Sequence, residues 1–486
     1  MRSIVNNNNN NNKNGENMKS SNFRRQSKHV KGLVYPMLMC SAVLWPAVAN
    51  SQSLEQAVAA TLTSHPDIRV AFSKFKVREQ QVEQASAGYL PSINVTGGYG
   101  YEQTDSPGSR REQSGGDDTE GLRRSEFGMS LKQILFNGFQ ISSDINRTSY
   151  ATSAEQWRLY SMAEDVALDV AKAYTSVLKA KEILVLSEKN LNSHKAIFSQ
   201  IQQRTNSGLG SIADLSQITG RLARAQSNVI SAKNNYVDSQ TQFYRITEQQ
   251  PDNLVIPIPD AELLPKEQTA GLDQALENHP VIKSSGNDIQ SANYQHDAAK
   301  SNYYPKVTFE LDANFNNDLD GEDGYSNGAG VGGHSNDVVA MVRFSYNLYA
   351  GGKDKAFEKE TAYKITEASE INRSVYRQVT EGYTLAWNAH EFLNQQIGYI
   401  KAHVIASKES QAAYQQQFKL GQRSLLDLLD TENELFQARK EYVDVEFNEI
   451  ITQYRLLNAT GQLLDSLRVT RPAVWQGEND YAGGVK

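Results

Sequence analysis

Two carboxylates near the end of the chain, Asp427 and Asp430, have the spacing of groups that act together. They are three residues apart in a helix-forming segment, so both side chains lie on one helical face. Such a face is usually only solvated. The alternative is that it lines a pore, where rings of carboxylates favour cations.

The other reactive side chains indicate structure more than chemistry. His65 and His279 each precede a proline that starts a helix, which argues against a metal site. Cys40 is the only cysteine and lies in a segment expected to be removed, which excludes disulfides and thiol catalysis. The sequence has no phosphate loop, nucleophile elbow or metalloprotease motif. An enzyme is therefore the least expected class, and no metal or cofactor is expected.

These residues belong to a duplicated chain. Gly208 matches Gly421 at an offset of 213 residues, and the two His-Pro pairs are 214 residues apart. Each copy predicts, in order, a helix, a strand, a loop rich in Gly and Asp, a second strand, a very long helix, a tight turn and a returning helix. Two copies of such strictly held length are more typical of a symmetric wall than of a catalytic pocket.

The predicted strands alternate apolar and polar residues over residues 93–102 and 307–316, and their partner strands behave alike. The hairpin loops, residues 104–124 and 317–336, look solvent-exposed. Strands of about ten alternating residues suit a bilayer crossing. A soluble antiparallel sheet has the same period, but the secretory signal described below and the lack of a covering apolar helix favour the membrane.

The predicted long helices, residues 140–207 and 353–420, contain no proline. In the first of them, apolar residues form a narrow stripe with a seven-residue period, which packs a helix on its neighbours and leaves its other sides in water. A simple coiled-coil dimer has the same stripe but leaves the strands unexplained. Gly208 and Gly421 mark the reversals, and Ser211 and Ser424 are predicted to cap the returning helices.

The chain divides into five predicted segments. Residues 1–49 are a secretory signal peptide with a low-complexity tract; the alternatives are a membrane anchor, or a lipoprotein signal at Cys40. Residues 50–250 form the first repeat, 251–269 a proline-rich linker, 270–467 the second repeat, and 468–486 a tail expected to be poorly ordered.

Charge and strand number limit the possible partners. Residues 50–486 carry 42 basic and 55 acidic side chains, which argues against a nucleic-acid partner. Four strands cannot close a barrel, and an open edge in lipid leaves backbone groups unpaired. An oligomer is therefore expected; two copies leave little lumen and three leave room for a channel.

The chain resembles the TolC family of outer-membrane efflux and type I secretion channels over residues 53–465. The resemblance rests on the duplication, on LYAGG at 348–352 and on FKLGQRSLLDLLD at 418–430. It implies an α+β membrane protein of the Gram-negative outer membrane, with a large periplasmic part. Four strands per chain would contribute to a trimeric twelve-stranded β-barrel, continued by a periplasmic α-helical barrel.

The resemblance also implies roles for residues at the helical turns. Asp427 and Asp430 match constricting aspartates of the pore, and Asp214 and Arg423 match residues that latch neighbouring helices at the tip. Phe418 stands in this latch where a relative often has tyrosine, so one hydrogen bond of the latch is in doubt. The turns that would dock a periplasmic adaptor contain Gly208, Leu209, Gly210, Gly421 and Gln422.

The function implied is a passive export duct, in contact with outer-membrane lipid, with a periplasmic adaptor and with an inner-membrane ABC or proton-driven transporter. Type I protein secretion is the leading interpretation, and multidrug or small-molecule efflux is the alternative. A structural or adhesive coiled-coil surface protein is the candidate from another class. A duct places its helices in the periplasm, whereas an adhesin exposes them outside the cell.

Overall fold

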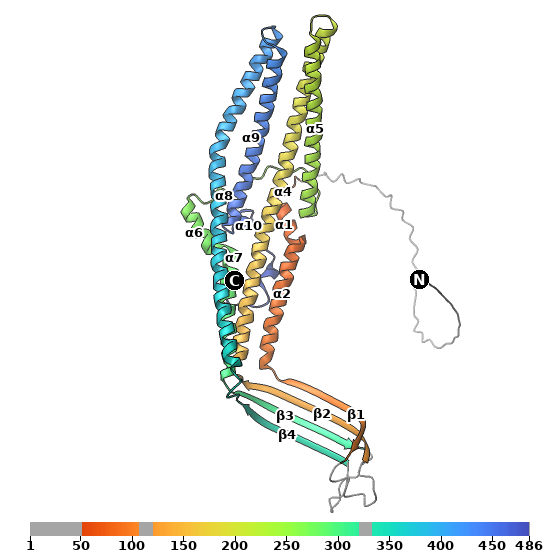
Figure 1. Ribbon diagram of the computed structural model, residues 1–486, viewed down its shortest axis with the longest axis vertical. Coiled ribbons are helices and arrows are strands. Elements are labelled where there is room, and N and C mark those ends of the chain that lie inside the picture. The colour runs from red at the N-terminus through yellow and green to blue at the C-terminus, as the bar shows by residue number, and fades with distance from the viewer. Residues whose placement is uncertain (1–50, 106–119, 320–332, 486) are drawn as a thin grey trace, which may run out of the picture. The chain divides into compact units, whose positions relative to one another are not determined.

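The computed structural model describes residues 51–105, 120–319 and 333–485 (Figure 1). The predicted signal peptide, its low-complexity tract and Cys40 lie outside these residues, as do the central parts of both predicted hairpin loops. Within the described residues, none of the helices combines the length and the apolar character that a membrane-spanning helix needs.

Each repeat begins with two helices where the sequence predicts one. In both, the chain breaks at the His-Pro pair, and the histidine Nδ1 accepts a hydrogen bond from a backbone N–H two residues on, at 3.3 Å. Burial lowers the pKa of His279 to about 4, so this ring stays neutral and can accept. These pairs are α1 (Leu54–Ser64) with α2 (Pro66–Ser86), and α6 (Gln268–Asn278) with α7 (Pro280–Lys300).

The four strands form one antiparallel sheet in the order β1-β2-β3-β4 (Figure 1). Each repeat contributes one hairpin, and β2 of the first repeat pairs with β3 of the second, with one irregularity between Ile134 and Phe136. Short 3₁₀ turns, η1 (Ala87–Tyr89) and η2 (Ser301–Tyr303), precede the hairpins. The strands are β1 (Ser92–Thr104), β2 (Glu120–Phe136), β3 (Lys306–Asp318) and β4 (Gly333–Ser345).

The two faces of the sheet differ as the alternation predicts. Leu131 lies opposite Ile93 on one side and Leu311 on the other, and the pairing continues from Leu311 to Ala340. This apolar face is exposed in the single chain; Val338, for example, is 67% exposed. The other face is mainly polar, although Val339 and Met341 of β4 lie on it opposite Asp312 and Glu310.

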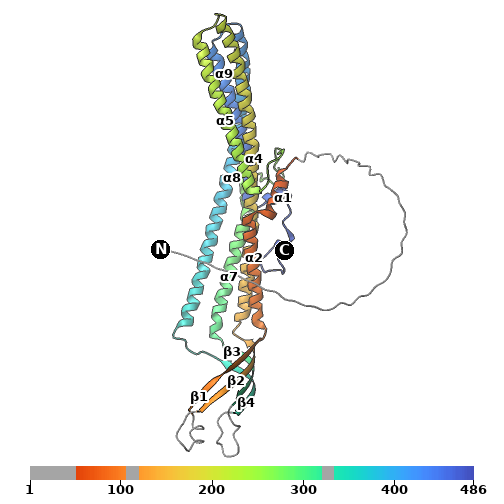
Figure 2. The same cartoon turned by 90° about the vertical axis from the view of Figure 1, so that its right-hand side faces the viewer.

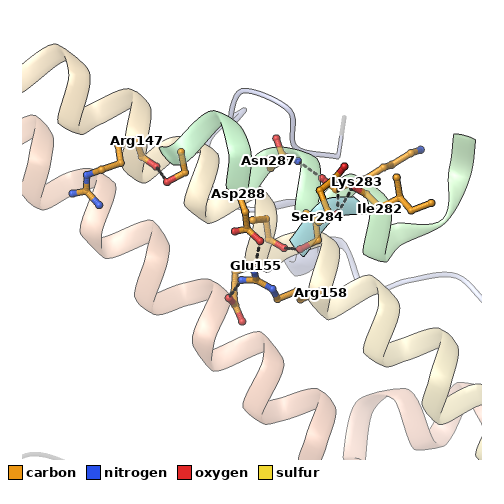
Figure 3. A network of polar contacts seen from close by, with 12 residues as sticks. Arg147, Glu155, Arg158, Ile282, Lys283, Ser284, Asn287 and Asp288 are labelled. Carbon is orange, nitrogen blue, oxygen red and sulfur yellow. Dashed lines mark hydrogen bonds and ion pairs between the residues drawn. The ribbon is translucent and has the colours of Figure 1, made fainter. Parts of the chain in front are cut away.

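The long helices have nearly the predicted bounds, and each packs against its own returning helix (Figure 2). Val170 and Val177 of the predicted stripe are buried. Arg158 ties the repeats together, because it pairs with Glu155 of its own helix and with Asp288 of α7 (Figure 3). The helices are α4 (Gln140–Asn206), α5 (Ile212–Thr247), α8 (Lys353–Lys419) and α9 (Leu425–Ala459).

The C-terminal tail is not poorly ordered, so that prediction is wrong. After α10 (Leu463–Ser466), the tail carries the 3₁₀ helix η3 (Ala473–Gln476) and packs against the helices. Trp475 is 3% exposed, and its carbonyl accepts a hydrogen bond from the Gln156 amide at 2.8 Å. Arg471 forms an ion pair with the buried Glu164 at 3.1 Å. Packing therefore holds a segment whose composition is typical of a loop.

The segment between the repeats is irregular from residue 251 to the start of α6. Its place is fixed by the hydroxyl of Tyr174, which accepts a hydrogen bond from Val255 N at 2.9 Å. The same hydroxyl lies 2.8 Å from the carbonyl oxygens of Gln52 and Val255. One buried side chain of α4 therefore holds both this segment and the start of the first repeat.

Candidate functional site

The two helical hairpins reverse through the same backbone motif. Gly208 and Gly421 have positive φ angles of 74° and 75°. The residue after each glycine donates its N–H to a carbonyl five residues back, at 2.8 and 2.9 Å, as in a Schellman cap. Leu209 is 78% exposed beside the first glycine. The predicted docking turns are therefore closed by the same backbone hydrogen bonds, and the first of them exposes Leu209 to solvent in the single chain.

A small hydrophobic cluster holds the four long helices together near these turns. Phe418, predicted to belong to a latch, is only 8% exposed and lies in this cluster. The guanidinium of Arg204 lies 5.9 Å from the centre of its ring. Phe418 thus contributes packing beneath the turns. The buried members of this tip core are Ile197, Ile201, Ile218, Phe418, Leu425, Leu428 and Leu429.

Asp427 is the third residue of α9 and forms a capping box with Ser424, the N-cap residue of this helix. Ser424 Oγ accepts a hydrogen bond from Asp427 N at 3.2 Å, and Asp427 Oδ2 accepts one from Ser424 N at 3.3 Å. This reciprocal capping box satisfies two backbone N–H groups that the helix start leaves free. A carboxylate here also interacts favourably with the helix dipole, so the local fold fixes where this charge lies.

Asp430 has a partner that the sequence did not point to. Its Oδ1 lies 3.0 Å from Nη2 of Arg221, which is on α5 of the first repeat. The two predicted constriction carboxylates thus lie one helical turn apart. Asp427 is held by a backbone N–H group, and Asp430 is held by the guanidinium of Arg221. The only sequence signal for Arg221 was that its counterpart at the 213-residue offset, Glu434, has the opposite charge.

The predicted latch residues Arg423 and Asp214 are not joined by an ion pair within the part of one chain that the structure describes. Arg423 instead donates from Nε to Gln417 Oε1 at 3.0 Å, and its guanidinium stacks 4.5 Å from the centre of the Tyr414 ring. Asp214 lies in the first turn of α5. Both side chains stay near the turns, where a neighbouring copy could meet them.

The described residues contain no group of three or more His, Cys, Asp or Glu side chains suited to a metal ion. The chemistry available at the tip is therefore that of fixed carboxylates, guanidinium groups and exposed turns. Such groups can select ions and grip a partner.

Comparison with known proteins identifies related chains. Residues 57–248 and 271–462 match the model of the outer membrane efflux protein family. The outer membrane efflux protein BepC of Brucella suis is 23% identical over 453 residues, covering 92% of this chain and 93% of the relative. Outer membrane protein TolC of Vibrio cholerae is 24% identical over 401 residues, covering 79% of this chain and 85% of the relative.

Among solved structures, the CmeC outer membrane channel of Campylobacter jejuni matches with a TM-score of 0.72 and 14% identity, covering 84% of this chain and 86% of that one. This likeness concerns the fold alone. It confirms the predicted class, an α+β protein with a duplicated unit of helices and strands.

Proposed function

Because the chain belongs to the outer membrane efflux protein family, we propose that three copies form a passive duct through which cargo driven by another machine leaves the cell. The protein belongs to the outer membrane of a Gram-negative bacterium and has a large periplasmic part. The observation that carries the proposal is the four-stranded sheet with an exposed apolar face and two open edges, β1 and β4. In lipid, such edges must be paired.

Three copies supply twelve strands, enough for a barrel with a lumen, whereas eight strands would be filled by side chains. The exposed apolar face would then contact lipid. The polar face would line the interior, where Glu310 pairs with Lys132 and Arg343. These ion pairs bridge neighbouring strands, which helps to keep charged groups satisfied inside the wall.

The helices offer matching edges for the same assembly. On α5, Ile230, Val237 and Tyr244 recur every seven residues and are 71%, 49% and 48% exposed. On α8, a stripe with the same period is formed by Leu385, Phe392 and Tyr399, which are 56%, 65% and 81% exposed. Because seven-residue stripes pack in pairs, we propose that α5 of one copy packs on α8 of the next.

This interface is tested by placing a charge in the α8 stripe. Leu385→Asp combined with Phe392→Asp is expected to convert the trimer into monomers, measured by light scattering of the detergent-solubilised protein. Lys401→Asp, an exposed change on the same helix, is the control. A double variant that stays trimeric would contradict the proposed packing.

At the tip, we propose that Asp427 and Asp430 form the pore constriction and that Arg423 of one copy latches Asp214 of the next. An Arg–carboxylate pair is directional, which suits a latch. Asp214→Ala or Arg423→Ala should then raise single-channel conductance in planar bilayers. Unchanged conductance in both variants would refute the latch assignment.

The proposed partners are a periplasmic adaptor, which would grip the turns at Gly208 and Gly421, and an inner-membrane ABC or proton-driven transporter, which would supply the energy. The adhesin alternative predicts that external protease cleaves these turns in intact cells. The duct predicts cleavage only after the outer membrane is opened.

We propose polypeptides, exported by type I secretion, as the cargo. Small toxic compounds are the second candidate, because relatives of this chain include the toluene efflux pump outer membrane protein TtgC of Pseudomonas putida. Deleting the gene separates the two cargoes. Loss of a protein from the culture medium indicates secretion, whereas increased sensitivity to toxic compounds with unchanged secreted protein indicates efflux.

A further inference from the structure

Arg221 brings a positive charge from the first repeat to the acidic residues of the second. Its Nη2 lies 3.0 Å from Asp430 Oδ1, although 209 residues separate the two in the sequence. The ion pair joins the two returning helices, α5 and α9, close to the turns.

The tip core holds this pair in position. Ile218, one turn before Arg221, and Leu429, next to Asp430, are both 0% exposed. The Arg221 and Asp430 side chains are 28% and 58% exposed. Packing of these two buried neighbours therefore sets the register of α5 against α9 that brings Arg221 and Asp430 together.

The duplication shows that the pairing is specific to one arrangement of the repeats. At the 213-residue offset, Gln217 corresponds to Asp430, and Arg221 corresponds to Glu434. Glu434 is itself engaged by His403 Nε2 at 2.9 Å. Arg221 and Glu434 thus carry opposite charges at equivalent positions, whereas Asp430 corresponds to the neutral Gln217. Among these four residues, the ion pair that joins the two repeats is the one between Arg221 and Asp430.

We propose that Arg221 sets the ion selectivity of the constriction by neutralising Asp430, so that Asp427 supplies most of the field that ions meet. This inference rests on the proposed duct and its constriction. A close pair of opposite charges has a field that largely cancels beyond the length of the pair, whereas the single charge of Asp427 persists. Moving α5 away from α9 would uncover Asp430 and make the opened tip more attractive to cations.

The test measures the K⁺/Cl⁻ permeability ratio of the purified channel from reversal potentials across planar bilayers, at low salt because salt screens the effect. Arg221→Gln removes the charge but keeps most of the side chain. It is expected to raise the ratio severalfold, and Asp430→Asn, which frees Arg221, should lower it. Combining the two substitutions should return the ratio towards that of the wild type. Arg224→Gln, an exposed arginine one turn further along α5, is the control and should leave the ratio unchanged.

A permeability ratio that is the same for Arg221→Gln and Arg224→Gln would overturn the inference. Asp427→Asn keeps this failure distinct from failure of the proposed function. If Asp427→Asn lowers the ratio while Arg221→Gln has no effect, the constriction stands and the role of Arg221 is refuted. If Asp427→Asn and Asp430→Asn both leave the ratio unchanged, the constriction is wrong, and the inference fails with it.

Discussion

Replacing Glu164 with glutamine is expected to flatten the pH dependence of stability. The Glu164 side chain is 3% exposed and forms an ion pair with Arg471 of the C-terminal tail. It also accepts a hydrogen bond from Leu464 N at 3.2 Å. Burial raises the pKa of this carboxyl from 4.5 to about 7, although Arg471 opposes the shift. The folded chain therefore binds a proton at Glu164 more tightly than the unfolded chain does.

The sign and size of the effect follow from that pKa. Because the pKa is raised on folding, the associated stability is fully present below about pH 4.5 and is lost as the pH rises through about 7. The difference between the two pKa values corresponds to about 3 kcal/mol per chain. Glutamine keeps an acceptor for Leu464 N but cannot ionise, so this loss should disappear.

The measurement compares thermal midpoints of wild type and Glu164→Gln from about pH 5 to about pH 8. Other titrating groups are common to both proteins. One of them, His279, has a pKa lowered to about 4, so its contribution runs the opposite way and is lost on acidification. Glu182→Gln, an exposed change on the same helix, is the control, and it should follow the wild-type curve. Parallel curves for wild type and Glu164→Gln would refute the reasoning.

Three other substitutions test the tail and the turns. Trp475→Ala should lower the free energy of unfolding by about 3–5 kcal/mol because it leaves a cavity. Val474→Ala, at an exposed position, is the control and should change this free energy by less than about 0.5 kcal/mol. Equal losses for the two variants in denaturant titrations would contradict the packed tail. Gly421→Ala places a Cβ at a φ of 75° and should cost about 1–2 kcal/mol, seen as a lower thermal midpoint. Ser424→Ala removes the cap of α9 and should cost about 1 kcal/mol; hydrogen exchange at the start of α9 should rise, and unchanged exchange would argue against the cap.

Local signals made the long elements predictable. The helix predicted over 140–207 is observed as Gln140–Asn206. Its length follows from the absence of proline, and its end follows from the turn at Gly208. The strands and their two faces follow from strict alternation. His65 and His279 were expected to be structural, and both cap helices.

Contacts between segments that are distant in the sequence could not be predicted from local sequence patterns. The pairing of Arg221 with Asp430 depends on how α5 lies against α9, and the tip core sets that register. The prediction of a poorly ordered tail was wrong because it took the glycines of the tail as a sign of backbone flexibility. A Cβ on Gly483 would lie 2.1 Å from Asn287 Oδ1, so this glycine permits a close approach.

Because neighbouring strands of the sheet follow one another in the sequence, the number of strands per chain decides whether two copies join through antiparallel or parallel strands. Each repeat adds two antiparallel strands, so the first and last strands of a chain, β1 and β4, run in opposite directions. Around a rotation axis, β4 therefore meets the β1 of the next copy as an antiparallel neighbour, the same kind of pairing found within the chain. An odd number of strands would force a parallel seam at every junction. A single repeat also obeys this rule, so duplication could halve the number of subunits in the ring without requiring a new kind of edge.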